Sequence, residues 1–133
     1  MTRGLLRAVQ LASGGRCDYC RTPEHLDPLP FQVDHIISIQ HGGPTVLSNL
    51  AWSCLHCNKH KGPNIAGIDP ETGQLVGLFH PRRQSWNRHF EWDGPVLVGR
   101  TRSGRATIVV LAINHPNVLE VRAEFFHEGA WLI

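Results

Sequence analysis

The chain has 133 residues, a formal net charge of +2 and an apolar fraction of 41%. This length and composition fit one folded unit with a modest hydrophobic core, and they exclude an intrinsically disordered chain. No run of 18 apolar residues occurs, and the first residues lack the apolar stretch of a signal peptide. We therefore expect a cytoplasmic protein with reduced cysteines and no membrane contact.

In the first third of the chain, apolar residues at helical spacing predict a helix over residues 2–13, which Gly14-Gly15 should end. A tight turn at residues 17–20 and a proline-containing loop follow. Apolar and polar residues then alternate over residues 31–34 and again over residues 37–40, which predicts two short strands.

The rest of the chain is divided by a clear stop at Gly62-Pro63. Residues 47–61, before this stop, read as helix, interrupted or tightened around a Cys-x-x-Cys pair. Beyond it the pattern predicts two strands and two helices, at residues 75–79, 96–98, 103–113 and 117–128. We predict a first part, residues 1–63, and a C-terminal extension, residues 64–133, which packs on the first part as one unit.

Four cysteines form two Cys-x-x-Cys pairs, Cys17/Cys20 and Cys54/Cys57. Two thiolate pairs with this spacing hold one tetrahedral zinc ion in many proteins. The alternatives are disulfide bonds or unpaired core cysteines, but a reducing compartment disfavours disulfides and two such pairs by chance are improbable. We predict that all four cysteines bind a structural Zn²⁺, which supplies a large share of the folding free energy.

A second set of residues lies between and just after these pairs: Asp34-His35, Gly42-Gly43, Asn49, Asn58 and Lys61. Together with the cysteines, over residues 17–62, they resemble the HNH endonuclease family in its zinc-knuckle subgroup. The resemblance implies a ββα-metal core. We therefore predict an α+β fold in which this core is stapled by the four-cysteine zinc site and carries a mixed α/β C-terminal extension.

The extension also contains short motifs, and these resemble an extension found in some stand-alone bacterial HNH proteins. They are Asp69-Pro70-x-Thr72-Gly73, Leu78-Phe79-His80-Pro81-Arg82, His89-Phe90-x-Trp92 and Gly104-Arg105-Ala106-Thr107.

The family resemblance implies divalent-metal-dependent hydrolysis of DNA phosphodiester bonds. His35 is implied as the general base, since its unperturbed pKa lies near neutrality. Asp34 and Asn58 are implied to hold the catalytic ion, and their hard oxygen ligands favour Mg²⁺ or Mn²⁺. Asn49 is implied to fix the loop whose backbone carbonyl orients the imidazole of His35. From the residues alone, Asn49 or Asn58 could instead be a helix or turn cap.

Basic residues gather in residues 59–105, so we expect an anionic partner, DNA, to meet the middle of the chain. Lys59, Lys61, Arg82 and Arg83 are the predicted nucleic-acid contacts, and the last two lie close to several aromatic residues. The alternative for Lys61 is a solvated charge at a helix end, and for the aromatic residues it is internal packing.

A function of a different class is a non-catalytic zinc module that binds nucleic acid or a protein partner. Such a module needs only the cysteines and the basic residues, and it gives no reason for Asp34, His35 and Asn58 to occur together. One HNH site cuts one strand at a time, so the sequence leaves open whether a homodimer or a protein partner takes part.

Overall fold

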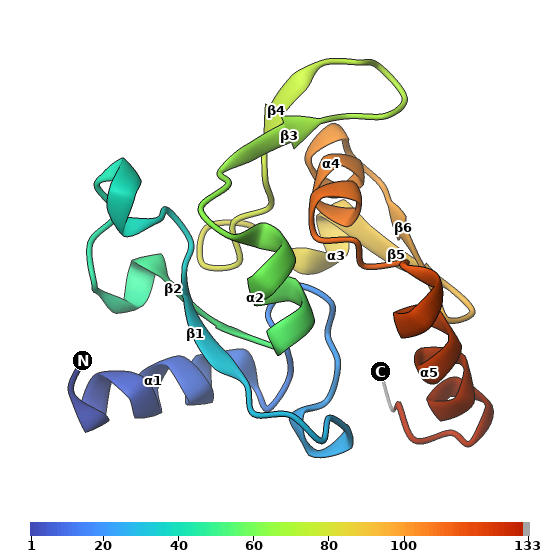
Figure 1. Cartoon of the computed structure of the whole chain (residues 1–133), viewed down its shortest axis with the longest axis horizontal. Helices are drawn as coiled ribbons and strands as arrows, with labels where there is room; N and C mark the ends of the chain where they lie inside the picture. The colour runs from blue at the N-terminus through green and yellow to red at the C-terminus, as the bar shows by residue number, and fades with distance from the viewer. Residues whose placement is uncertain (132–133) are drawn as a thin grey trace. The chain divides into compact units, whose positions relative to one another are not determined.

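The computed structural model describes residues 1–131, which form two compact units (Figure 1). Unit 1 comprises Met1–Ile65 together with the short segment His80–Gln84. Unit 2 comprises Ala66–Phe79 and the chain from Ser85 onward. The expectation that the C-terminal extension packs on residues 1–63 stays a prediction.

Unit 1 begins with helix α1, Arg3–Ser13, as the apolar spacing predicts. The hydroxyl of Thr2 accepts a hydrogen bond from the backbone N–H of Leu5 at 3.1 Å, which caps the first turn. Gly14, at φ 66°, ends the helix in the left-handed conformation that glycine adopts without strain. Val9 is fully buried, and α1 contacts strand β2.

The centre of unit 1 is an antiparallel hairpin followed by a helix. Strand β1, Gln32–His35, pairs with β2, Leu50–Ser53, so that Asp34 lies opposite Ala51. Helix α2, Leu55–Lys61, follows β2 directly and contacts β1 (Figure 1). This ββα order and the small antiparallel sheets confirm the predicted α+β fold.

Two predicted elements of unit 1 are wrong. Residues 47–61 are not one helix, because Leu50–Ser53 is a strand between a 3-10 helix at Leu47–Asn49 and α2. All four residues of that strand are buried, so the alternation that identifies a strand is absent. Residues 37–40 are not a strand either, since a 3-10 helix forms at Ile39–His41. Another 3-10 helix, Glu24–Leu26, lies in the loop before β1.

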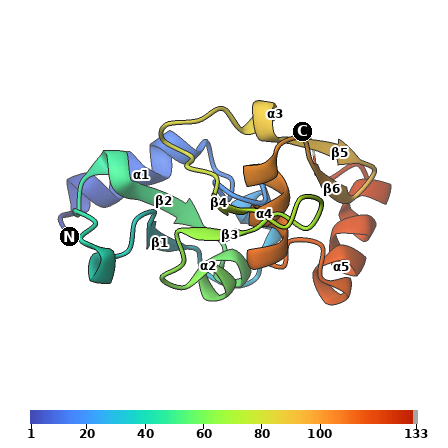
Figure 2. The same cartoon turned by 90° about the horizontal axis from the view of Figure 1, so that it is seen from above.

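Up to residue 131, unit 2 contains two antiparallel hairpins and three helices. Helix α4, Arg102–Val110, contacts strands of both hairpins, as Figure 2 shows for β3 and β6. The elements around it are β3 Ala66–Ile68, β4 Leu75–Gly77, α3 Trp86–His89, β5 Phe90–Asp93, β6 Val96–Gly99 and α5 Pro116–His127. The structure confirms the predicted strands at residues 75–79 and 96–98 and both predicted helices. It adds β3, β5 and α3.

The motifs of the C-terminal extension have internal roles in unit 2. Asp69, in the β3–β4 turn, accepts hydrogen bonds from two nitrogens of Arg105 at 2.8 and 3.0 Å and from the hydroxyl of Thr72 at 2.7 Å. The guanidinium of Arg105 holds the pKa of Asp69 well below its usual value. The hydroxyl of Thr107 accepts from the backbone N–H of Phe79. These contacts join the β3–β4 hairpin to α4.

The aromatic residues of the extension contact one another within unit 2. Trp92 lies 5.4 Å from Phe126 and 5.6 Å from Trp131 between ring centroids. The guanidinium of the buried Arg122 stands 5.4 Å from the Trp92 ring centre. Internal packing therefore accounts for these side chains.

Among the described residues, no helix combines the length and apolar character needed to cross a membrane.

Candidate active site and metal centre

The four cysteines come together in unit 1, as the sequence predicts. Their ligand atoms all lie within 4.8 Å of one another and all four side chains are buried. The sulfurs of Cys20 and Cys54 are 3.7 Å apart, which is no disulfide bond. Four Zn–S bonds of about 2.3 Å in a tetrahedron would place sulfurs about 3.8 Å apart, so this four-cysteine cluster fits a zinc ion.

The first cysteine pair is tied to the hairpin through Asp18. Its backbone N–H donates to the carbonyl of Trp52 at 2.8 Å, and its carboxylate accepts from the backbone N–H of Trp52 at 2.7 Å. The carboxylate also pairs with Arg82 at 2.9 Å. Arg82 thereby holds the segment His80–Gln84 in unit 1.

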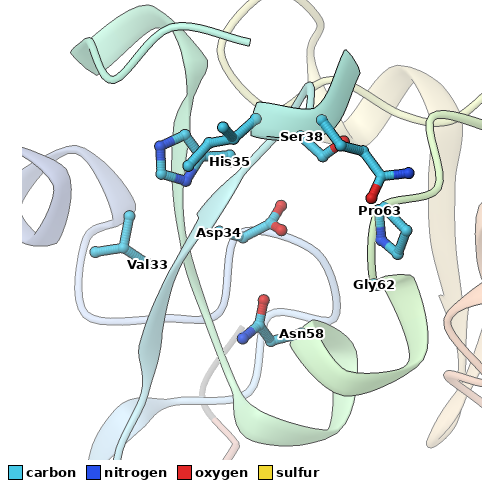
Figure 3. A pocket seen from close by; sticks show the side chains of 9 residues that line it. Val33, Asp34, His35, Ser38, Asn58, Gly62 and Pro63 are labelled. Atoms are coloured by element: carbon cyan, nitrogen blue, oxygen red, sulfur yellow. The ribbon is translucent and has the colours of Figure 1, made fainter. Parts of the chain in front are cut away.

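A hollow of about 420 Å³ lies where β1 ends beside the C-terminal end of α2. Figure 3 shows Asp34 and Asn58 on facing sides of it, with the amide oxygen of Asn58 directed toward Asp34. His35 points to the other side of the β1 ribbon from Asp34 in this view, as alternation along a strand requires. The lining residues are Val33, Asp34, His35, Ser38, Ile39, Gln40, Asn58, Gly62 and Pro63.

The Asp34 carboxylate is held by two donors. Its Oδ2 accepts a hydrogen bond from the hydroxyl of Tyr19 at 2.6 Å and lies 3.1 Å from the ammonium of Lys61. Its Oδ1 lies 3.3 Å from the same ammonium. Burial raises the pKa of Asp34 above its usual value, while the charge of Lys61 and the Tyr19 hydroxyl act in the opposite sense.

The structure gives Lys61 a different place from the one the sequence suggests. Its side chain is 1% exposed, so it is neither a solvated helix-end charge nor a surface contact for a phosphate. The ammonium donates to the backbone carbonyls of His35 and Ile36 at 3.2 and 3.0 Å as well as to Asp34. Lys61 therefore fastens the end of α2 to the end of β1.

Replacing Lys61 by methionine should lower the free energy of unfolding by about 3 kcal/mol or more, because Asp34 keeps a buried charge without its partner. Urea denaturation of the metal-loaded protein measures this. Lys59→Met is the matched control: Lys59 is exposed on the same helix, so its loss should change stability by about 0.5 kcal/mol at most. Equal stability of the two variants would contradict the role assigned to Lys61.

The imidazole of His35 is held by a hydroxyl. Its Nε2 lies 2.9 Å from Oγ1 of Thr45, whereas the family resemblance implies a backbone carbonyl as the orienting group. When Nε2 carries the proton and donates it to Thr45, Nδ1 has a free lone pair. In that tautomer Nδ1 is available as a proton acceptor.

Asn49 ties together the loop that connects β1 to the 3-10 helix Leu47–Asn49. Its side-chain oxygen accepts from the N–H of Ile37, and its amide nitrogen donates to the carbonyls of Ile37 and Pro44, each at 2.9 Å. A Cβ on Gly43 would lie 1.7 Å from the Ile37 carbonyl oxygen, so only glycine fits this close turn. Asn49 thus ties the loop that leads to Thr45.

Asn58 is oriented by Gln32, which stands at the start of β1. The amide nitrogen of Asn58 donates to the side-chain oxygen of Gln32, which leaves the oxygen of Asn58 for the hollow. Asn58 is not the cap of the turn after the second cysteine pair; Cys54 itself caps α2 by accepting from the N–H of Cys57 at 3.4 Å.

The four residues predicted to contact nucleic acid separate into two kinds. Lys59 and Arg83 are exposed on unit 1. Arg82 and Lys61 are largely buried and form ion pairs with Asp18 and Asp34, respectively. The basic residues also divide differently from the sequence expectation: unit 1 has eight Lys or Arg against four Asp or Glu, and unit 2 has five against seven.

Three residues that position the site were not found from the sequence: Tyr19, Gln32 and Thr45. Tyr19 lies between Cys17 and Cys20, where nothing in its spacing points to a carboxylate 15 residues away. Gln32 and Thr45 contact Asn58 and His35 over separations of 26 and 10 residues. Gln32 and Thr45 reach Asn58 and His35 only through the pairing of β1 with β2 and the path of the loop after β1.

Comparison with known proteins agrees with this geometry. The model of the HNH endonuclease family matches residues 17–64. Septu protein PtuA of Bacillus mycoides (strain KBAB4) is 25% identical over 139 aligned positions, which cover 86% of this chain and 20% of that protein. The chain therefore spans about a fifth of this relative's length, and the likeness reaches into the C-terminal extension. No solved structure matches the chain significantly. The ββα order and the four-cysteine cluster lie within the same stretch, residues 17–64, that is similar to the HNH endonuclease family.

Proposed function

We propose that this protein is a divalent-metal-dependent endonuclease that hydrolyses DNA phosphodiester bonds. The observation that carries the proposal is that Asp34, His35 and Asn58 line one hollow within the stretch that matches the HNH family. A non-catalytic zinc module gives no reason for these three residues to occur around one hollow.

His35 is the proposed general base. A phosphodiester repels hydroxide through its negative charge, so water must lose a proton as it attacks phosphorus. The contact of Nε2 with Thr45 orients the ring, and it is compatible with the tautomer in which Nδ1 accepts that proton. Asn49 keeps the loop that carries Thr45 in place through its three hydrogen bonds.

The residues present fit a hard divalent cation. Asp34 offers the carboxylate oxygen Oδ1, which Tyr19 does not occupy, and Asn58 offers an amide oxygen whose direction Gln32 sets. Carboxylate and amide oxygens suit Mg²⁺ or Mn²⁺ better than softer ions. An ion held by Asp34 and Asn58 would supply positive charge to the phosphate and to the leaving 3′-oxygen.

The charge of unit 1 supports DNA as the substrate. Two of its four acidic residues, Asp18 and Asp34, are neutralised inside the unit by Arg82 and Lys61. Arg3, Arg7, Lys59 and Arg83 remain exposed. This excess of exposed basic side chains favours a polyanion, and binding through them should weaken with salt.

A supercoiled plasmid assay with purified, zinc-loaded protein tests the proposal. We expect nicked or linear DNA in the presence of Mg²⁺ or Mn²⁺, and intact plasmid when the added metal is omitted or EDTA stops the reaction. Zinc content is measured in every sample, so that loss of activity is not confused with loss of the structural ion. Intact plasmid under all conditions, with salt-sensitive DNA binding retained, would instead support a non-catalytic nucleic-acid-binding module.

A further inference from the structure

One side chain joins the four-cysteine cluster to the proposed active site. Tyr19 lies between Cys17 and Cys20 and is fully buried. Its hydroxyl donates to Oδ2 of Asp34 at 2.6 Å. The ligand turn for the structural ion therefore supplies a hydrogen-bond donor directly to the carboxylate that lines the hollow.

The phenol is held in place by the backbone around it. Within the turn, the N–H of Cys17 donates to the carbonyl of Thr22 at 2.9 Å, and the N–H of Arg21 donates to the carbonyl of Cys17 at 3.0 Å. The adjacent Asp18 exchanges two hydrogen bonds with the backbone of Trp52 in β2. The position of the Tyr19 hydroxyl therefore depends on the folded turn at residues 17–20. A zinc ion bound by the four thiolates would stabilise that turn.

The effect of this hydroxyl on Asp34 is directional. Oδ2 accepts the hydrogen bond from the phenol and lies 3.1 Å from the ammonium of Lys61. Oδ1 lies 3.3 Å from the same ammonium. Without the phenol, the carboxylate loses the donor that holds Oδ2, and rotation about its last torsion is less restricted. Burial raises the pKa of the Tyr19 hydroxyl well above its usual value, so the hydroxyl remains a donor at neutral pH.

We propose that Tyr19 is a positioning residue that couples the four-cysteine cluster to divalent-metal binding by Asp34 and Asn58. The inference rests on the proposed function for the identity of that second site. Partners that orient a metal-ligating carboxylate typically change metal affinity by about 10- to 100-fold when they are removed. Tyr19 acts through Asp34 and has no direct part in the reaction.

Tyr19→Phe tests this, because it removes one oxygen and keeps the buried ring. We expect Mn²⁺ to bind about tenfold more weakly, measured on the zinc-loaded protein without DNA by Mn²⁺ electron paramagnetic resonance or calorimetry. The zinc content should remain one ion per chain. In the nicking assay, the half-saturating Mn²⁺ concentration should rise by the same factor, with the rate at saturating Mn²⁺ within about twofold of wild type.

Two further variants make the result specific. Glu24→Ala removes the carboxylate that accepts from the indole nitrogen of Trp52 at 2.8 Å, a hydrogen bond in the same unit with no link to Asp34, and should leave Mn²⁺ affinity unchanged. Asp34→Asn should abolish the Mn²⁺ binding that is being measured, which assigns it to this site.

Each outcome supports or overturns the proposed coupling between the four-cysteine cluster and divalent-metal binding. Wild-type Mn²⁺ affinity in Tyr19→Phe would overturn it, and so would a loss of zinc in parallel with Mn²⁺, which would make Tyr19 a purely structural residue. A wild-type protein that binds no Mn²⁺ at Asp34 would overturn it as well. If wild type binds Mn²⁺ but cuts no DNA, the proposed function fails, while the Mn²⁺ measurements still support or refute the coupling.

Discussion

Replacing His35 by alanine should lower the rate of plasmid nicking by about 10²- to 10⁴-fold, the usual contribution of a positioned general base. His35 is half-buried at the end of β1, and its ring makes one hydrogen bond, to Thr45. Its loss should therefore leave the circular dichroism spectrum, the zinc content and Mn²⁺ binding close to wild type. Single-turnover nicking at saturating Mn²⁺ isolates the chemical step from metal binding.

His41→Ala is the matched control for this variant. His41 is exposed, stands six residues further on at the end of the 3-10 helix Ile39–His41, and does not line the hollow. It should cleave at the wild-type rate. Cleavage by His35→Ala at the wild-type rate would refute the general-base assignment, and a His35→Ala protein that lost zinc would show that the histidine acts on the fold.

The sequence predicted the parts of this fold that have a local cause. The four cysteines were recognised as one site because metal-ligand spacing is a local property. Helix α1 was recognised because its apolar face repeats at helical spacing. Strand β2 was missed because both of its faces are buried, so Leu50–Ser53 carries no alternation. A short buried strand and a buried helical turn look alike in sequence.

For the candidate site, the sequence predicts the candidate catalytic residues but not the side chains that orient them. Asp34, His35 and Asn58 were identified together through the family resemblance, and they line one hollow in the structure. The sequence predicts Lys61 at a phosphate because it follows Asn58 by three residues on the same helical face, with a solvated helix-end charge as the alternative. Its actual burial depends on where β1 ends relative to α2, which no local pattern encodes. Tyr19 was missed for the same reason.

Removing the ion from the four-cysteine cluster should unfold unit 1. The cluster joins the turn at residues 17–20 to the start of α2, and the core around it is small. Structural zinc contributes about 10–16 kcal/mol of apparent binding free energy in small zinc-dependent domains, more than a unit of this size can replace by packing. Strong chelation should therefore abolish the cooperative thermal transition of unit 1 and its helical circular dichroism.

Variants separate a zinc site from the alternatives for these cysteines. Cys20→Ser and Cys54→Ser should each lose bound zinc and unfold to a similar extent, because a closed tetrahedral site needs all four thiolate ligands. A reducing agent should have no effect on the wild-type protein, whose cysteines form no disulfide in the structure. If the chelated protein kept its melting transition, the cysteines would be ordinary core residues. The Tyr19 phenol would then be held by packing alone, and treatment with the chelator followed by its removal would leave Mn²⁺ binding at Asp34 unchanged.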